Sequence, residues 1–137
     1  MTPNQKGEIA ELRVQLRAVE KGYIASRPAV ASRYDLIIDT GTELLRTQVK
    51  YADTASSHAT GSVLVGLRPG RERGQRRNKH VYCVGQIDLI LVYIAKVDKI
   101  ACLKPEVFSG RSSLTIRFEQ AKNVQLKAIR RLEDILW

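Results

Sequence analysis

The stretch Gln86–Ile94 constrains the fold of this chain more than any other feature. It reads Gln-Ile-Asp-Leu-Ile-Leu-Val-Tyr-Ile and is the most apolar part of the sequence. The run is rich in residues that favour strands, and it is far shorter than the roughly 18 apolar residues that a membrane span needs. We therefore expect a strand at the centre of a sheet, and no membrane span anywhere in the chain.

Length and charge narrow the class of protein further. A chain of 137 residues with 44% hydrophobic residues predicts a single domain, 1–137, with a real core. The net charge of +9 and the pI near 9.9 predict binding to a polyanion, with nucleic acid first and an anionic membrane surface second. The N-terminal residues lack the apolar core of a signal peptide, and Cys83 and Cys102 suit a reducing compartment as free thiols. We expect a cytoplasmic protein.

Periodicity predicts a helix at each end of the chain. The first helix spans Gln5–Lys21, begins at an Asn4 cap and ends at Gly22. Its expected buried stripe is Ile9, Leu12, Leu16 and Val19. The second helix spans Ala121–Trp137, and its apolar face either covers the sheet or contacts another subunit.

The expected strands lie between these helices. A hairpin of Arg33–Asp39 and Glu43–Tyr51 turns at Thr40–Glu43, and Pro105–Ser113 is expected to be a polar linker. The resulting fold is α/β, a mixed sheet flanked by an N-terminal and a C-terminal helix. The other expected strands are Tyr23–Pro28, Ser62–Leu67, Gln86–Ile94, Ile100–Leu103 and Leu114–Phe118.

A basic segment runs from Arg68 to His80. It contains six Lys or Arg residues and one acid, together with glycine and proline, and it shows no periodicity. Such a segment predicts a loop that contacts DNA phosphates, which would make binding depend strongly on salt. An arginine of this loop can also read a guanine edge. The candidate DNA-binding residues are Arg68, Arg71, Arg73, Arg76, Arg77 and Lys79.

The hairpin carries the residues that suit phosphodiester hydrolysis. Asp35 lies on its first strand, and Gln48 and Lys50 lie two apart on its second, so their side chains share a face. Carboxylate and amide oxygens suit Mg²⁺, and the Val49 carbonyl offers another oxygen. A lysine beside such a metal can orient or deprotonate the attacking water. On the first helix Glu8 and Glu11 both lie within reach of the sheet, and the spacing does not choose between them.

The order Gly7-x-x-x-Glu11, Tyr34-Asp35 and Gln48-x-Lys50 resembles the PD-(D/E)XK nuclease superfamily. Within it, the chain looks most like the cyanobacterial group I intron-encoded homing endonucleases, because the resemblance continues through Tyr82, Gln86–Tyr93, Asn123-x-Gln125 and Glu133–Trp137. The resemblance implies double-strand cleavage of a long pseudo-palindromic DNA site by a homo-oligomer, a dimer or a tetramer. It implies Mg²⁺ as the cofactor, with Mn²⁺ as a substitute. It also implies an active site of Glu11, Asp35, Gln48 and Lys50, with Glu11, Asp35, Gln48 and Val49 around the metal.

One departure from the superfamily pattern keeps alternatives open. Gln48 stands where the superfamily usually has a second acid, which weakens metal affinity and leaves the number of metals open. This departure supports one alternative function, a DNA-binding module that has lost catalysis. A second alternative is a nuclease that resolves Holliday junctions, which would share the metal site but recognise branched DNA.

Overall fold

Strand β5 (Leu89–Ile94) runs through the middle of the protein, as its apolar sequence predicts. All six of its residues are buried. Ile90, Val92 and Ile94 point into one hydrophobic cluster, and Leu89, Leu91 and Tyr93 point into another on the opposite face. A continuous apolar run thus fills two cores at once, because successive side chains of a strand alternate between faces.

The computed structural model describes residues 1–55, 61–69, 82, 85–119 and 129–137. The helical elements of this part are α1 (Pro3–Glu20), α2 (Pro105–Phe108) and the 3₁₀ turn η1 (Leu132–Asp134). No helix among these residues is long and apolar enough to cross a membrane. Besides β5, the strands are β1 (Ile24–Ser26), β2 (Leu36–Asp39), β3 (Leu44–Ala52), β4 (Ser62–Gly66), β6 (Lys99–Leu103), β7 (Ser113–Arg117) and β8 (Ile129–Arg131).

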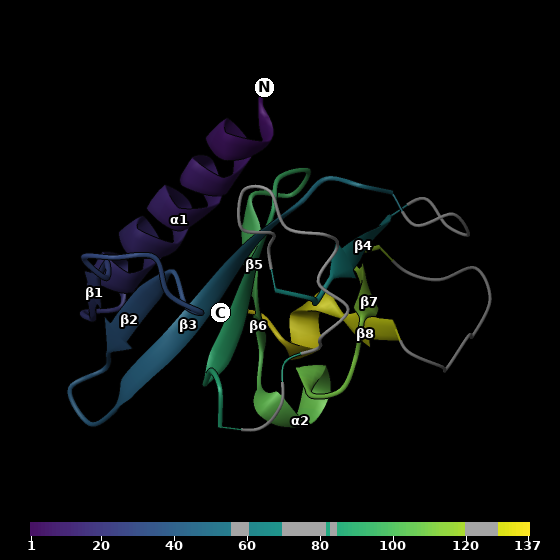
Figure 1. Cartoon of the computed structure of the whole chain (residues 1–137). Coiled ribbons are helices and arrows are strands. Elements are labelled where there is room, and N and C mark those ends of the chain that lie inside the picture. Colours follow the sequence, from purple (N-terminus) through teal and green to yellow (C-terminus); the bar gives the residue numbers. More distant parts are fainter. Residues whose placement is uncertain (56–60, 70–81, 83–84, 120–128) are drawn as a thin grey trace.

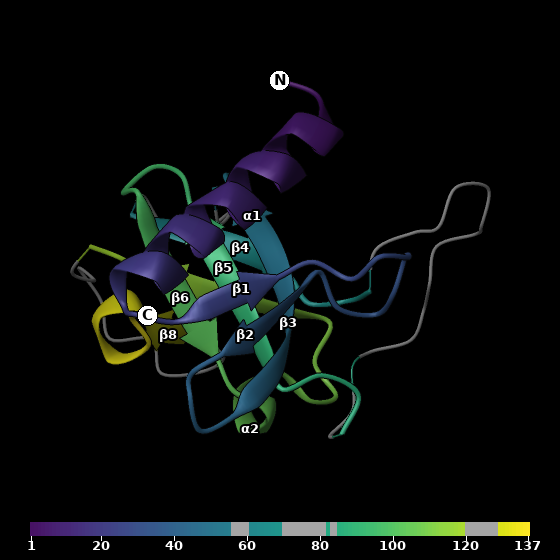
Figure 2. The same ribbon diagram turned by 90° about the vertical axis from the view of Figure 1, so that its left-hand side faces the viewer.

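The strands form two sheets that enclose the larger core between them. The main sheet has the order β1-β2-β3-β5-β6 and is mixed, with β3 and β5 parallel and the other neighbours antiparallel. Helix α1 lies across one face of it, and the smaller sheet β4-β7-β8 lies on the other side (Figures 1 and 2). This arrangement confirms the expected α/β fold with a mixed sheet and an N-terminal helix.

The hairpin β2–β3 is confirmed, although β2 is shorter than expected. Its first residue, Leu36, pairs with Thr47, so Arg33–Asp35 precede the strand. The Asp39 side chain accepts a hydrogen bond of 2.8 Å from the Gly41 amide, which stabilises the turn. At the far end of the hairpin, Asp88 accepts bonds from the Arg46 amide (2.8 Å) and Nε (3.1 Å), fastening β3 to the start of β5.

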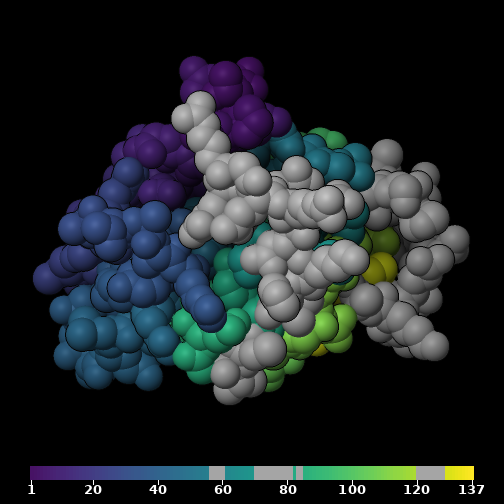
Figure 3. Space-filling model, in the orientation of Figure 1, coloured from purple at the N-terminus to yellow at the C-terminus, as the bar shows by residue number. Residues whose placement is uncertain are grey.

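The buried face of α1 differs from the expected stripe. The residues in contact with the sheet are Ala10, Val14 and Ala18, whereas Leu12, Leu16 and Val19 are exposed and only Ile9 packs partly against the core. Small side chains spaced by four let the helix approach the sheet closely, and Figure 3 shows α1 against the β1–β3 side of the surface. The cap is also different, because Thr2 and Gln5 form a capping box in place of the expected Asn4.

The predicted C-terminal helix is wrong over residues 129–137; residues 121–128 lie outside the described part. Strand β8 pairs in parallel with β7, and the last residues run extended along the edge of β6. The Cys102 amide donates to the Ile135 carbonyl (2.7 Å), and the Trp137 amide donates to the Ile100 carbonyl (2.9 Å). An otherwise open sheet edge supplies backbone partners that a helical pattern in the sequence cannot reveal.

The structure bears on two smaller expectations in the same region. The linker Pro105–Ser113 contains the short helix α2, whose Phe108 is fully buried in the larger core. The Trp137 ring lies 6.5 Å from that of Tyr23, with the Lys21 ammonium 4.8 Å from its centre, so the C-terminal residue covers the main sheet.

Candidate active site

The candidate site lies where β3 extends beyond the start of β2. Because Leu36 pairs with Thr47, the segment Gln48–Ala52 continues past the end of its neighbour, while on its other side it pairs with β5. Asp35 stands immediately before β2, and its amide donates to the Thr47 carbonyl at 2.9 Å. Side chains from both faces of the sheet can therefore meet at this uncovered stretch of strand edge.

Asp35 is held against β3 through one carboxylate oxygen. Its Oδ2 accepts hydrogen bonds from Gln48 Nε2 at 2.6 Å and from the Val49 amide at 2.8 Å. Burial raises the pKa of Asp35, against the opposing effects of the Val49 amide, Lys50 and Gln48. Since the N–H and C=O of a strand residue point to the same edge, the Val49 carbonyl also faces this side.

Gln48 and Lys50 point away from α1, toward the core between the two sheets. Gln48 Oε1 accepts a hydrogen bond of 2.9 Å from the hydroxyl of Tyr82. The Lys50 ammonium donates to the Arg68 carbonyl at 2.9 Å, which fastens the start of the basic segment to the site. Burial lowers the pKa of Lys50, while the nearby Asp35 charge raises it, so the neutral amine is easier to form than in an exposed lysine.

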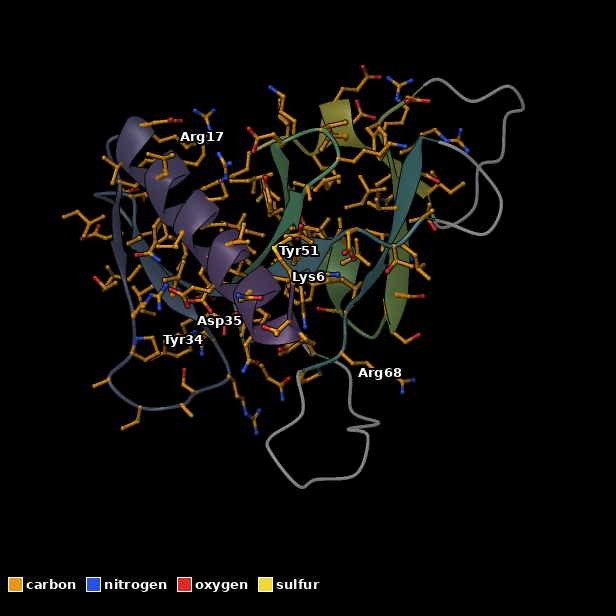
Figure 4. All side chains as sticks on the ribbon, turned by 90° about the horizontal axis from the view of Figure 1, so that it is seen from above. Lys6, Arg17, Tyr34, Asp35, Tyr51 and Arg68 are labelled. Atoms are coloured by element: carbon orange, nitrogen blue, oxygen red, sulfur yellow. The ribbon has the colours of Figure 1, made fainter. Side chains whose placement is uncertain are left out.

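The helix acids differ in where they face. Glu11 lies beside the buried face of α1 and is largely covered, and Figure 4 shows Asp35 next to this helix. Burial and then the Asp35 charge raise the pKa of Glu11, against the effect of Arg27. Glu8 is exposed and binds the Arg27 guanidinium through both oxygens, at 2.7 and 3.3 Å. The same guanidinium lies 3.4 Å from Glu11.

We therefore expect Glu11→Gln to reduce DNA cleavage at least about 10²-fold, since it removes a partly buried charge near Asp35. Glu8→Gln is its matched control on the same helix and should leave the rate within about threefold, because surface ion pairs of this kind contribute little. Single-turnover cleavage rates of the two variants make the comparison. Equal rates for both, or a larger loss for Glu8→Gln, would contradict this assignment.

The structure brings Asp35, Gln48, Val49, Lys50 and Glu11 to one place. Arg68 lies on the same side of the protein (Figure 4). Two neighbours of the site, Arg27 and Tyr82, had no role assigned from the sequence. Arg27 is one of many cations in the sequence, and Tyr82 was noted only as part of the resemblance to the nuclease family. The other candidate DNA-binding residues lie outside the described residues: Arg71, Arg73, Arg76, Arg77 and Lys79.

The donor set suits a hard divalent cation. Two carboxylates, Asp35 and Glu11, lie near enough for the Asp35 charge to raise the pKa of Glu11, and a bound cation would relieve that repulsion. The Val49 carbonyl adds a neutral oxygen, and Gln48 Oε1 keeps one lone pair after accepting from Tyr82. Oxygen-only ligands of this kind, completed by waters, fit Mg²⁺.

An acid, an amide-x-lysine pair and a helix acid thus lie together at one strand edge of a mixed sheet, and these are residue types that metal-dependent phosphodiester hydrolysis uses. The family model for PD-(D/E)XK endonucleases matches residues 1–135, so this chain belongs to the PD-(D/E)XK endonuclease family. Among solved structures, the chain is similar to the bacterial homing endonuclease I-Ssp6803I with a TM-score of 0.70 and 22% sequence identity. The match covers 93% of this chain and 83% of that one, and at this identity it shows a shared fold. No curated protein sequence matches.

Proposed function

We propose that this protein is a Mg²⁺-dependent, sequence-specific DNA endonuclease of the homing type, which hydrolyses one phosphodiester in each strand of a long, nearly palindromic site. The observation that carries the proposal is the convergence of Asp35, Lys50 and Glu11 at the uncovered edge of β3. Membership of the PD-(D/E)XK endonuclease family and the fold shared with a homing endonuclease support it.

In this proposal Asp35 and Glu11 would hold the cation through carboxylate oxygens, with the Val49 carbonyl and Gln48 Oε1 as neutral ligands. A bound cation would supply Lewis-acid polarisation of the scissile phosphate and neutralise developing charge. Lys50 stands beside Asp35 with a pKa that burial lowers, so it can orient the attacking water and take its proton. The ammonium that this proton transfer forms then places a positive charge beside the phosphate.

DNA is the expected partner because the chain carries a net charge of +9 and the basic segment starts at the site. Lys50 binds the backbone of Arg68, so the segment 68–79 begins within reach of a phosphate bound there. Its six cations would contact the DNA backbone on either side of the cut. A homo-oligomer with two-fold symmetry would match the symmetry of a palindromic site and supply one active site for each strand.

The experiment that tests the proposal is cleavage of a randomised duplex library by the purified protein, in Mg²⁺, in Mn²⁺ and in EDTA. We expect metal-dependent cuts within one long motif, and no cuts in EDTA. Cuts confined to branched DNA would indicate a junction-resolving nuclease. Binding to duplex DNA without cuts in any metal would identify a DNA-binding module that has lost catalysis. Either result would overturn the proposal.

A further inference from the structure

A buried tyrosine hydroxyl reaches the candidate site from a distant part of the chain. Tyr82 is 2% exposed, and its hydroxyl lies 2.9 Å from Gln48 Oε1, 34 residues earlier in the sequence. The amide of the same Gln48 contacts Asp35 with its other end. We infer that Tyr82 is a positioning residue, whose hydroxyl holds the Gln48 amide in place against Asp35 and, through it, fixes the orientation of the Asp35 carboxylate.

The aromatic ring of Tyr82 is anchored independently of the site. It belongs to the core between the two sheets and meets the ring of Phe108 edge-on, with centroids 6.4 Å apart at 82°. Its backbone carbonyl accepts a hydrogen bond of 3.0 Å from the Gly110 amide. The hydroxyl therefore projects from a fixed support, as a positioning group must.

The chemistry of the three groups selects one direction for the amide. The two ends of a glutamine side chain have nearly the same shape, but one end only accepts hydrogen bonds and the other only donates. The ionised Asp35 Oδ2 only accepts, so it takes the Nε2 end of Gln48 at 2.6 Å. The Oε1 end is left facing Tyr82, whose hydroxyl donates to it. With the amide reversed, two oxygens would oppose each other at Asp35.

This chain of bonds determines which oxygen of Asp35 stays available. Gln48 Nε2 and the Val49 amide both donate to Oδ2, and no N–H donor in the described part of the chain contacts Oδ1. Oδ1 is thus the oxygen presented to a cation.

The test is Tyr82→Phe, which removes the hydroxyl and keeps the buried ring. Since the consequence for cleavage rests on the proposed nuclease function, two readouts are needed. The first is Mn²⁺ affinity and the single-turnover cleavage rate, both expected to fall about 10- to 100-fold with DNA affinity unchanged. The matched control is Tyr93→Phe, another buried tyrosine, whose hydroxyl donates to Asp98 at 2.9 Å on the α1 side of the sheet. It should leave both quantities unchanged.

The second readout does not depend on cleavage. In the ¹⁵N spectrum, the side-chain amide pair of Gln48 is identified by its absence in Gln48→Leu. We expect this pair to shift in Tyr82→Phe and to stay in place in Tyr93→Phe. An unmoved pair overturns the inference whether or not the protein cuts DNA.

Coupling between the two residues completes the test. In the Gln48→Leu background the hydroxyl has no amide to orient, so adding Tyr82→Phe should change the cleavage rate and Mn²⁺ affinity no further. If instead the double variant lost the product of the two single-variant losses, Tyr82 would act by another route, and the positioning role would be overturned. If the wild type cuts no DNA, the proposed function fails, while the amide spectrum and Mn²⁺ affinity still decide this inference.

Discussion

Replacing Asp35 with asparagine is expected to abolish cleavage while DNA binding persists. The variant keeps the shape of the side chain and its bond from the Val49 amide, but it removes the charge that holds a cation. A loss of about 4 kcal/mol in transition-state stabilisation, the scale of one metal-held charge, corresponds to a rate about 10³-fold lower. Single-turnover cleavage and gel-shift binding with the same duplex measure the two properties separately.

The same variant should not be less stable than the wild type. Burial raises the pKa of Asp35 in the folded protein, so the ionised carboxylate costs folding free energy at every pH above its ordinary value. Removing that charge should leave the melting temperature at pH 7 equal or slightly higher. Asp39→Asn, in the turn at the other end of β2, is the matched control and should cut DNA at the wild-type rate. Loss of folding or of DNA binding in Asp35→Asn would instead indicate a structural role.

Lys50→Met is expected to reduce the cleavage rate about 10²- to 10⁴-fold, the range associated with a general base or its charge. Methionine preserves the unbranched stem but removes the ammonium, including its bond to the Arg68 carbonyl. Because that bond fastens the basic segment, a modest loss of DNA affinity is expected as well. Lys99→Met, at the exposed start of β6, is the control for the general effect of a lost surface charge.

Lys50→Arg separates the two roles of the lysine. Arginine keeps the positive charge but stays protonated, so it cannot accept a proton from water. A rate as low as that of Lys50→Met would support proton transfer, and a rate near the wild type would mean that the charge alone matters. A wild-type rate for Lys50→Met would remove Lys50 from the mechanism. Rates measured at saturating DNA keep the binding effect out of this comparison.

The sequence predicted those parts of the fold that depend on local pattern. The apolar run at Leu89–Ile94 is the central strand, and the hairpin around Gly41 forms as expected, since both signals lie within a few residues of each other. The rotation of α1 was not predictable in this way. The helix has a large apolar stripe and a small one, and the sheet receives Ala10, Val14 and Ala18 because they allow close approach.

In the candidate site, too, the sequence predicted what depends on local pattern and missed what depends on packing. The order of Glu11, Asp35, Gln48 and Lys50 could be read from the sequence, and Gln48 and Lys50 share a face because alternation in a strand is local. The choice between Glu8 and Glu11 could not be made from the sequence, because it depends on the rotation of α1 about its axis. The Tyr82 hydroxyl at Gln48 joins residues 34 positions apart, and no periodicity encodes such a contact.

By itself, the sequence determined the α/β class, the central strand, the hairpin, and the residue types needed for metal-dependent hydrolysis. Only the tertiary structure decided that β2 begins at Leu36 and leaves an uncovered stretch of β3, where Asp35, Gln48 and Val49 meet. It also decided that the C-terminal residues run along the β6 edge instead of forming a helix. The physical reason is common to both: backbone groups at a sheet edge are satisfied by whichever segment the packing places there, and that segment is remote in the sequence.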